Sequence, residues 1–220
     1  MKMNTLAALG LIASVAPTSL AAAQGYGYGD GEHESPSSGY EEPAPEPVTE
    51  IWFDMERPQI IKDAGCAPYA TAKVHVKSEG PVEVMEVSLS NLPPNTEFDF
   101  FVTQVPNFPF GLSWYQGDIE TDEYGEAEAK FIGRFNAETF FVAVGSAPAP
   151  QIHETDAAEN PTTAPVHTLH LGLWFESPED AAAAGCPDIT TPFNGEHNAG
   201  VQVLNTGSFP DEAGPLGQLK

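Results

Sequence analysis

The chain has few basic residues: 8 Lys and Arg stand against 32 Asp and Glu in 220 residues, a net charge of −24 at pH 7. A surface of this charge repels phosphate backbones and anionic lipids. We therefore expect no nucleic acid as a partner. Beyond the N-terminal region no stretch is apolar enough to cross a bilayer, so we expect no membrane insertion of the mature chain.

Sequence motifs of catalysis are also lacking. There is no nucleophile elbow, serine-triad order, phosphate loop or dinucleotide fingerprint. Carboxylates are abundant, however, and a glycosidase pair is defined by its separation in space and not along the chain. The sequence therefore favours a non-catalytic protein without a cofactor, and leaves an enzyme open.

The N-terminus has the three parts of a signal peptide. Lys2 is followed by an apolar stretch at residues 6–20 and by three alanines at residues 21–23. The apolar stretch is shorter than the roughly 20 residues of a spanning helix and ends in a small-residue cleavage pattern. These features predict a signal peptide at residues 1–23 and a secreted protein, extracellular or associated with a cell wall.

Residues 24–49 combine Gly-Tyr repeats with an acidic, proline-rich run and contain no basic residue. Such a composition buries too little apolar surface to offset the entropy of ordering, which predicts a disordered tail. Residues 208–220 are expected to form a C-terminal tail. The folded domain is expected at residues 50–207.

Only two cysteines are present, Cys66 and Cys186, and each follows an Ala-Gly dipeptide. An even pair in an exported protein predicts one disulfide. Two buried free thiols are the alternative. A paired-cysteine metal site would need CxxC-like spacing or nearby histidines, which are absent.

From residue 51 onward the hydrophobic period is two. In residues 70–78, Ala72, Val74 and Val76 alternate with polar residues, as in a half-buried strand. Short strands at this spacing predict an all-β fold, an antiparallel two-sheet β-sandwich. In residues 82–90 the apolar face switches, which predicts a β-bulge. The other strands are expected at residues 51–55, 98–105, 112–118, 126–135, 139–144, 166–175 and 200–204.

One short helix is predicted near residues 178–184. Ser177 is a capping residue, Pro178 suits the first helical position, and Gly185 ends the pattern. The helix would be about two turns long.

The Leu-Pro-Pro-Asn-Thr-x-Phe sequence at residues 92–98, followed by Thr-Asp-x-x-Gly at residues 121–125, resembles the framework of several extracellular immunoglobulin-like sandwiches. The resemblance implies an immunoglobulin-like arrangement of the strands. It implies nothing about activity, because such folds carry many unrelated functions.

Two metal sites are conceivable. His153, His170 and His197 would supply zinc or copper ligands if the loops at residues 146–165 and 187–199 converge. The second candidate is the acidic run Asp118, Glu120 and Asp122, whose oxygen ligands suit calcium. Carboxylates at every second position are also typical of the solvent-exposed face of a hairpin strand, which is the alternative to a calcium site.

Aromatic residues suggest a ligand platform. Trp114, Tyr115 and Trp174 would stack on sugars or bind proline-rich peptides if they share an exposed surface. Filling of the core is the alternative, because tryptophans in sandwiches are usually at least partly buried.

We therefore expect a secreted, non-catalytic β-sandwich that binds a carbohydrate or an extracellular protein at a cell surface or in a matrix. A secreted metal-dependent enzyme that uses the loop histidines and carboxylates is the first alternative. A structural wall or coat component, with the tail as its working part, is the second.

Overall fold

A computed structural model describes residues 45–135, 140–141 and 165–220, which belong to one unit, residues 45–220. The predicted signal peptide and residues 24–44 of the predicted tail lie outside the described residues. Among the described helices, none is both long and apolar enough to span a bilayer.

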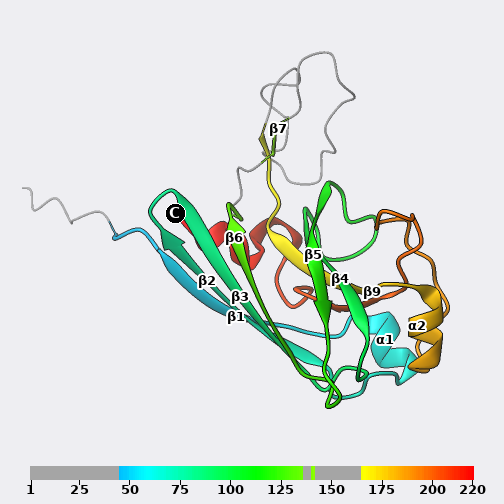
Figure 1. Cartoon of the computed structure of the whole chain (residues 1–220). Helices are drawn as coiled ribbons and strands as arrows, with labels where there is room; N and C mark the ends of the chain where they lie inside the picture. The colour runs from blue at the N-terminus through cyan, green and yellow to red at the C-terminus, as the bar shows by residue number, and fades with distance from the viewer. Residues whose placement is uncertain (1–44, 136–139, 142–164) are drawn as a thin grey trace, which may run out of the picture. The chain divides into compact units, whose positions relative to one another are not determined.

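Two four-stranded antiparallel sheets form the predicted β-sandwich (Figure 1). A separate ladder pairs β7 (Phe140–Phe141) with β8 (Pro165–Val166). The strand order does not confirm the immunoglobulin-like topology, which stays a prediction. The first sheet has the order β1 (Glu50–Met55), β2 (Thr71–Glu79), β3 (Val82–Ser90), β6 (Ala127–Gly133), and the second the order β10 (Gln202–Asn205), β9 (His170–Phe175), β4 (Glu97–Thr103), β5 (Ser113–Glu120).

The main core lies between the two sheets. β2 contributes Ala72, Val74 and Val76, and β4 contributes Phe98 and Phe100, all fully buried. Burial of a valine or phenylalanine side chain stabilises the fold by about 1.5–3 kcal/mol relative to an exposed one. The period-two pattern of the sequence therefore marks the inward face of β2 correctly.

The β-bulge predicted in residues 82–90 is wrong. β3 pairs with both β2 and β6 without a shift of register. The apolar pattern changes because one inward position is Glu83, whose carboxylate accepts a hydrogen bond from the Phe135 amide and lies 3.4 Å from Nε of Arg134. A buried acid with partners, not an extra residue, breaks the alternation.

The predicted helix is present as α2 (Pro178–Ala183). The Ser177 hydroxyl accepts a hydrogen bond from the Asp180 amide at 3.1 Å, as its capping position requires. A second short helix, α1 (Gln59–Ala64), was not predicted. It follows Pro58 and ends at Gly65, but its six residues are too few to show a helical period.

The predicted disulfide joins Cys66 to Cys186, whose Cα atoms are 5.1 Å apart. Each cysteine follows a glycine with positive φ at the end of a short helix, Gly65 after α1 and Gly185 after α2. The two helices lie side by side at one end of the sandwich (Figure 1). The disulfide therefore connects two parts of the chain that are 120 residues apart in sequence.

Residues 208–220 contribute to the packed unit. They form two 3-10 turns, η1 (Asp211–Ala213) and η2 (Pro215–Gln218), and Leu216 and Leu219 are buried in the main core. The amide of Lys220 donates a hydrogen bond to the carbonyl of Val48 at 2.9 Å. The segment expected to be a C-terminal tail therefore packs against the sandwich.

Removing the disulfide by replacing Cys66 and Cys186 with alanine should lower the free energy of unfolding by about 5 kcal/mol, the chain-entropy value for a loop of this length. Denaturant unfolding of the variant and the wild type measures the difference. A loss below about 1 kcal/mol would contradict a constraining role for the disulfide.

Gly125 should not tolerate a side chain. Its φ is 78°, and a Cβ atom there would lie 2.0 Å from the Leu92 carbonyl oxygen. We expect Gly125→Ala to lower the free energy of unfolding by more than about 2 kcal/mol. Gly80→Ala is the matched control, because Gly80 has a φ of 67° but no atom within 4 Å of the new Cβ. Equal losses in the two variants would show that backbone strain alone determines the effect.

Candidate functional site

The histidines proposed as metal ligands do not form a group in the part of the chain that the structure describes. His153 lies outside the described residues. His170 is buried, and its two ring nitrogens lie 2.9 Å from the Thr206 hydroxyl and 3.0 Å from the Asp211 carbonyl. His197 is exposed in the loop after α2. The contacts of His170 are therefore those of a structural histidine.

The acidic run of β5 does not converge on one point. Asp118 and Glu120 are exposed on the strand, whereas the Asp122 carboxylate accepts hydrogen bonds from the amides of Tyr124 and Glu126 at 2.8 and 3.0 Å. Asp122 thus organises the β5–β6 turn. Asp118 instead approaches acidic residues from other strands.

The three aromatic residues of the predicted platform do not share an exposed surface. Trp174 is fully buried, Trp114 is partly buried against the main core, and Tyr115 is 49% exposed. Trp114 and Tyr115 are neighbours in β5 and point to opposite faces of the strand. Core filling, the alternative reading of the sequence, describes Trp174.

Three carboxylates meet at the outer face of the second sheet, and we call Asp99, Asp118 and Glu176 the carboxylate cluster. One oxygen from each lies within 4.8 Å of one from each of the others. Asp99 and Asp118 are paired across β4 and β5, and Glu176 follows the last residue of β9. Asp99 is 1% exposed, whereas Asp118 is exposed and Glu176 half-buried. The cluster therefore extends from the interior to the surface.

A register shift in β5 shapes this cluster. The pairing of β4 with β5 shifts between Phe100 and Phe101, which face Gly117 and Tyr115. The extra residue places Tyr115 and Asp118 on the same face although they are three positions apart, and the Tyr115 hydroxyl donates a hydrogen bond to Asp118. Strict alternation would have put the two side chains on opposite faces.

Burial raises the pKa of Asp99 to about 8, and the neighbouring carboxylates of Glu176 and Asp118 add to the rise, while the Asn194 amide opposes it. Burial and the Asp118 carboxylate also raise the pKa of the Tyr115 hydroxyl. Both shifts have the same origin, because low solvent access and like charges disfavour a further negative charge. At neutral pH the cluster therefore favours a bound proton or another positive charge.

An aromatic cluster lies beside the carboxylates on the same face. Trp174 is in ring contact with Phe101, Phe110 and Phe193 at centroid distances of 5.4, 5.2 and 5.1 Å. The loop at residues 106–111 and the loop after α2 supply Phe110 and Phe193. These loops cover the outer face of β4 and β9, which explains why β4 is buried on both faces.

A groove of about 570 Å³ opens next to the aromatic cluster. We call it the aromatic groove. Its rim carries three exposed apolar side chains, Ile60 of α1, Phe108 and Ile189. The groove is also lined by Gln59, Asn107, Phe110, Trp174, Thr190, Phe193 and Gln202.

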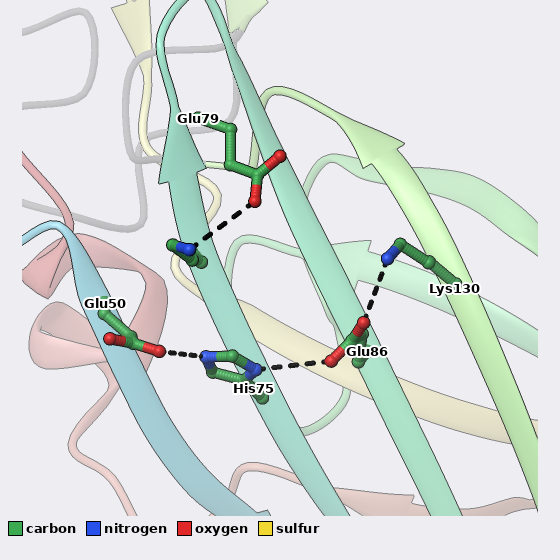
Figure 2. A network of polar contacts seen from close by, with 6 residues as sticks. Glu50, His75, Glu79, Glu86 and Lys130 are labelled. Carbon is green, nitrogen blue, oxygen red and sulfur yellow. Dashed lines mark hydrogen bonds and ion pairs between the residues drawn. The ribbon is translucent and has the colours of Figure 1, made fainter.

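The outer face of the first sheet carries a network of charged side chains. His75 lies between the carboxylates of Glu50 and Glu86 at 2.6 and 3.4 Å, and Glu86 also binds Lys130 at 3.0 Å (Figure 2). Trp52, 69% exposed, stacks on the His75 ring with centroids 3.6 Å apart. Exposed ion pairs of this kind contribute little to stability, because water screens the charges. We interpret this face as a solvated surface held in register by cross-strand pairs.

Comparison of the chain with models of known protein families finds no match, and comparison with curated proteins finds no similar sequence.

The raised pKa of Asp99 makes stability depend on pH. The folded state binds the Asp99 proton more tightly than the unfolded state, so this contribution is complete below pH 3.8 and is lost as the pH rises to about 8. We expect the free energy of unfolding of the wild type to fall over this range relative to that of Asp99→Asn, whose amide does not titrate. Denaturant unfolding in buffers that contain EDTA measures both. If the free energies of unfolding of the two proteins depend on pH in the same way, the raised pKa of Asp99 is refuted.

Proposed function

We propose that this protein is a secreted, non-catalytic β-sandwich module that binds an apolar segment of an extracellular protein in the aromatic groove. The gathering of exposed apolar side chains at the rim of the groove carries the proposal. Carbohydrate, the other ligand class expected from the sequence, is the competing occupant.

Exposed apolar surface is concentrated at the groove. Nine large hydrophobic residues are exposed in the described part of the chain, and three of them line this one feature. Phe108, Ile60 and Ile189 are 86%, 45% and 38% exposed. Contiguous exposed apolar patches rimmed by polar residues often mark interaction sites. A partner that covers these three side chains would remove their surface from water.

Two buried donors support a polypeptide ligand. Nε1 of Trp174 and Nε2 of Gln202 have no hydrogen-bond partner among the described residues, and both residues line the groove. A buried donor without a partner costs about 1–3 kcal/mol. Backbone carbonyls of a bound segment are acceptors that would lower this cost if the lining shifts on binding.

The chemistry of the lining favours protein over carbohydrate. Among the described residues, no charged one lines the groove, and the polar side chains there are amides and hydroxyls such as Gln59, Asn107 and Thr190. A sugar presents many hydroxyl groups that need partners when buried. An apolar segment with aromatic, aliphatic or proline side chains needs fewer polar partners.

The two alternatives depend on other parts of the chain. A metal-dependent enzyme that uses loop histidines would require His170 to exchange its contacts with Thr206 and Asp211 for a metal. A wall or coat component would depend on residues 24–49, most of which lie outside the described residues. The groove supports neither alternative.

Peptides selected on the immobilised protein from a display library should bind through the groove. We expect Phe108→Ser and Ile189→Ser each to weaken binding of selected peptides about 10- to 30-fold, the scale of interface hot spots. Isothermal titration calorimetry with synthetic peptides measures the dissociation constants.

Tyr124→Ser and Ile132→Ser are the matched controls, because Tyr124 and Ile132 are 76% and 66% exposed but do not line the groove. These variants should bind the peptides as the wild type does. The proposal fails if the groove variants bind as well as the controls. Binding on a glycan array that Phe108→Ser abolishes would assign the groove to carbohydrate instead.

A further inference from the structure

The carboxylate cluster has no positive counter-charge among the described residues. None of the described ion pairs includes Asp99, Asp118 or Glu176. Three carboxylates whose oxygens approach within 4.8 Å repel one another, and burial of Asp99 strengthens the repulsion by excluding water. A proton or a cation bound here would offset this charge.

Asp99 itself is incompletely bonded. Its side chain is 99% buried, since the residue is 1% exposed, yet its Oδ2 atom has no hydrogen-bond partner among the described residues. Buried carboxylate oxygens normally accept hydrogen bonds or coordinate metals. The Asp99 carboxylate is one of the three that meet in the cluster, so a cation placed there would offset the charge of this carboxylate.

We propose that Asp99, Asp118 and Glu176 bind one hard divalent cation, with calcium as the expected ion. All three ligands are carboxylate oxygens, the type that calcium, magnesium and manganese prefer over zinc or copper. Calcium binds oxygen at about 2.3–2.6 Å, so two ligands of one ion lie at most about 5 Å apart. The cluster oxygens, all within 4.8 Å of one another, meet this limit. The exposed side at Asp118 leaves room for water molecules to complete the coordination shell.

This ligand set differs from the acidic run that the sequence suggested. It keeps Asp118 but replaces Glu120 and Asp122, neighbours along the chain, with residues from two other strand segments. The cation would therefore join β4, β5 and the end of β9. Asn194, whose Nδ2 donates to the Glu176 carbonyl at 2.9 Å, connects the loop that carries Phe193 to the same point.

Calcium binding to the EDTA-treated, dialysed protein tests the proposal. We expect one calcium ion per chain by isothermal titration calorimetry in about 0.15 M KCl, which screens loose binding to the acidic surface. Asp99→Asn and Glu176→Gln should each weaken this binding at least about tenfold. Far-ultraviolet circular dichroism of each variant shows whether it folds. If Asp99→Asn does not fold, Glu176→Gln, at a half-buried position, still tests the proposal.

Glu120→Gln and Asp122→Asn are the matched controls, because they remove carboxylates of the acidic run outside the cluster. Both should bind calcium as the wild type does. Loss of binding in these controls with retention in Asp99→Asn would overturn the proposal in favour of the acidic run. Absence of a calcium-binding step in the wild type would also overturn it and assign the neutralisation to a proton.

Terbium luminescence supplies a second readout that does not depend on stability. Trp174 is paired with Asp99 across β4 and β9, so terbium in the cluster should accept energy from excited Trp174. Calcium should displace the terbium signal, and magnesium should displace it less well because it needs a tighter octahedral site. A terbium signal that persists unchanged in both Asp99→Asn and Glu176→Gln would contradict the assignment.

Discussion

β4 lies between β5 and β9 and is covered on both faces, and this double burial determines the rest of the second sheet. On its inner face Phe98 and Phe100 fill the main core. On its outer face Phe101 packs against Trp174, beneath the loops that also form the aromatic groove. The same cover removes Asp99 from water, so one constraint produces both an apolar groove and a buried carboxylate.

The two features of this outer face have opposite electrostatic character. In the described part of the chain, the groove is lined by uncharged residues, whereas the carboxylate cluster consists of three acids without a basic partner. A low local dielectric favours apolar contacts in the groove and magnifies repulsion in the cluster. The loop that carries Phe193 and Asn194 contacts both features, because Phe193 lines the groove and Asn194 donates a hydrogen bond to the Glu176 carbonyl.

Much of the fold could be predicted because it depends on local pattern. Alternation identified β2, the Ser177 cap identified α2, and the cysteine count identified the disulfide between Cys66 and Cys186. Predictions failed for two reasons. In β3 a non-local contact overrides the pattern, because the buried Glu83 has partners and no bulge is needed. The helix α1 was missed because it is too short to show a period.

The sequence by itself determined most of the strands, the two-layer class, one helix and the covalent link, because hydrophobic period, capping chemistry and cysteine parity act over short distances. Only the tertiary structure decided that Trp174 is buried, that Phe108 is exposed, and that Asp99 meets Asp118 and Glu176. Those outcomes depend on which loops cover a sheet and on a register shift in β5. Such long-range contacts produce no periodic pattern in the amino-acid sequence.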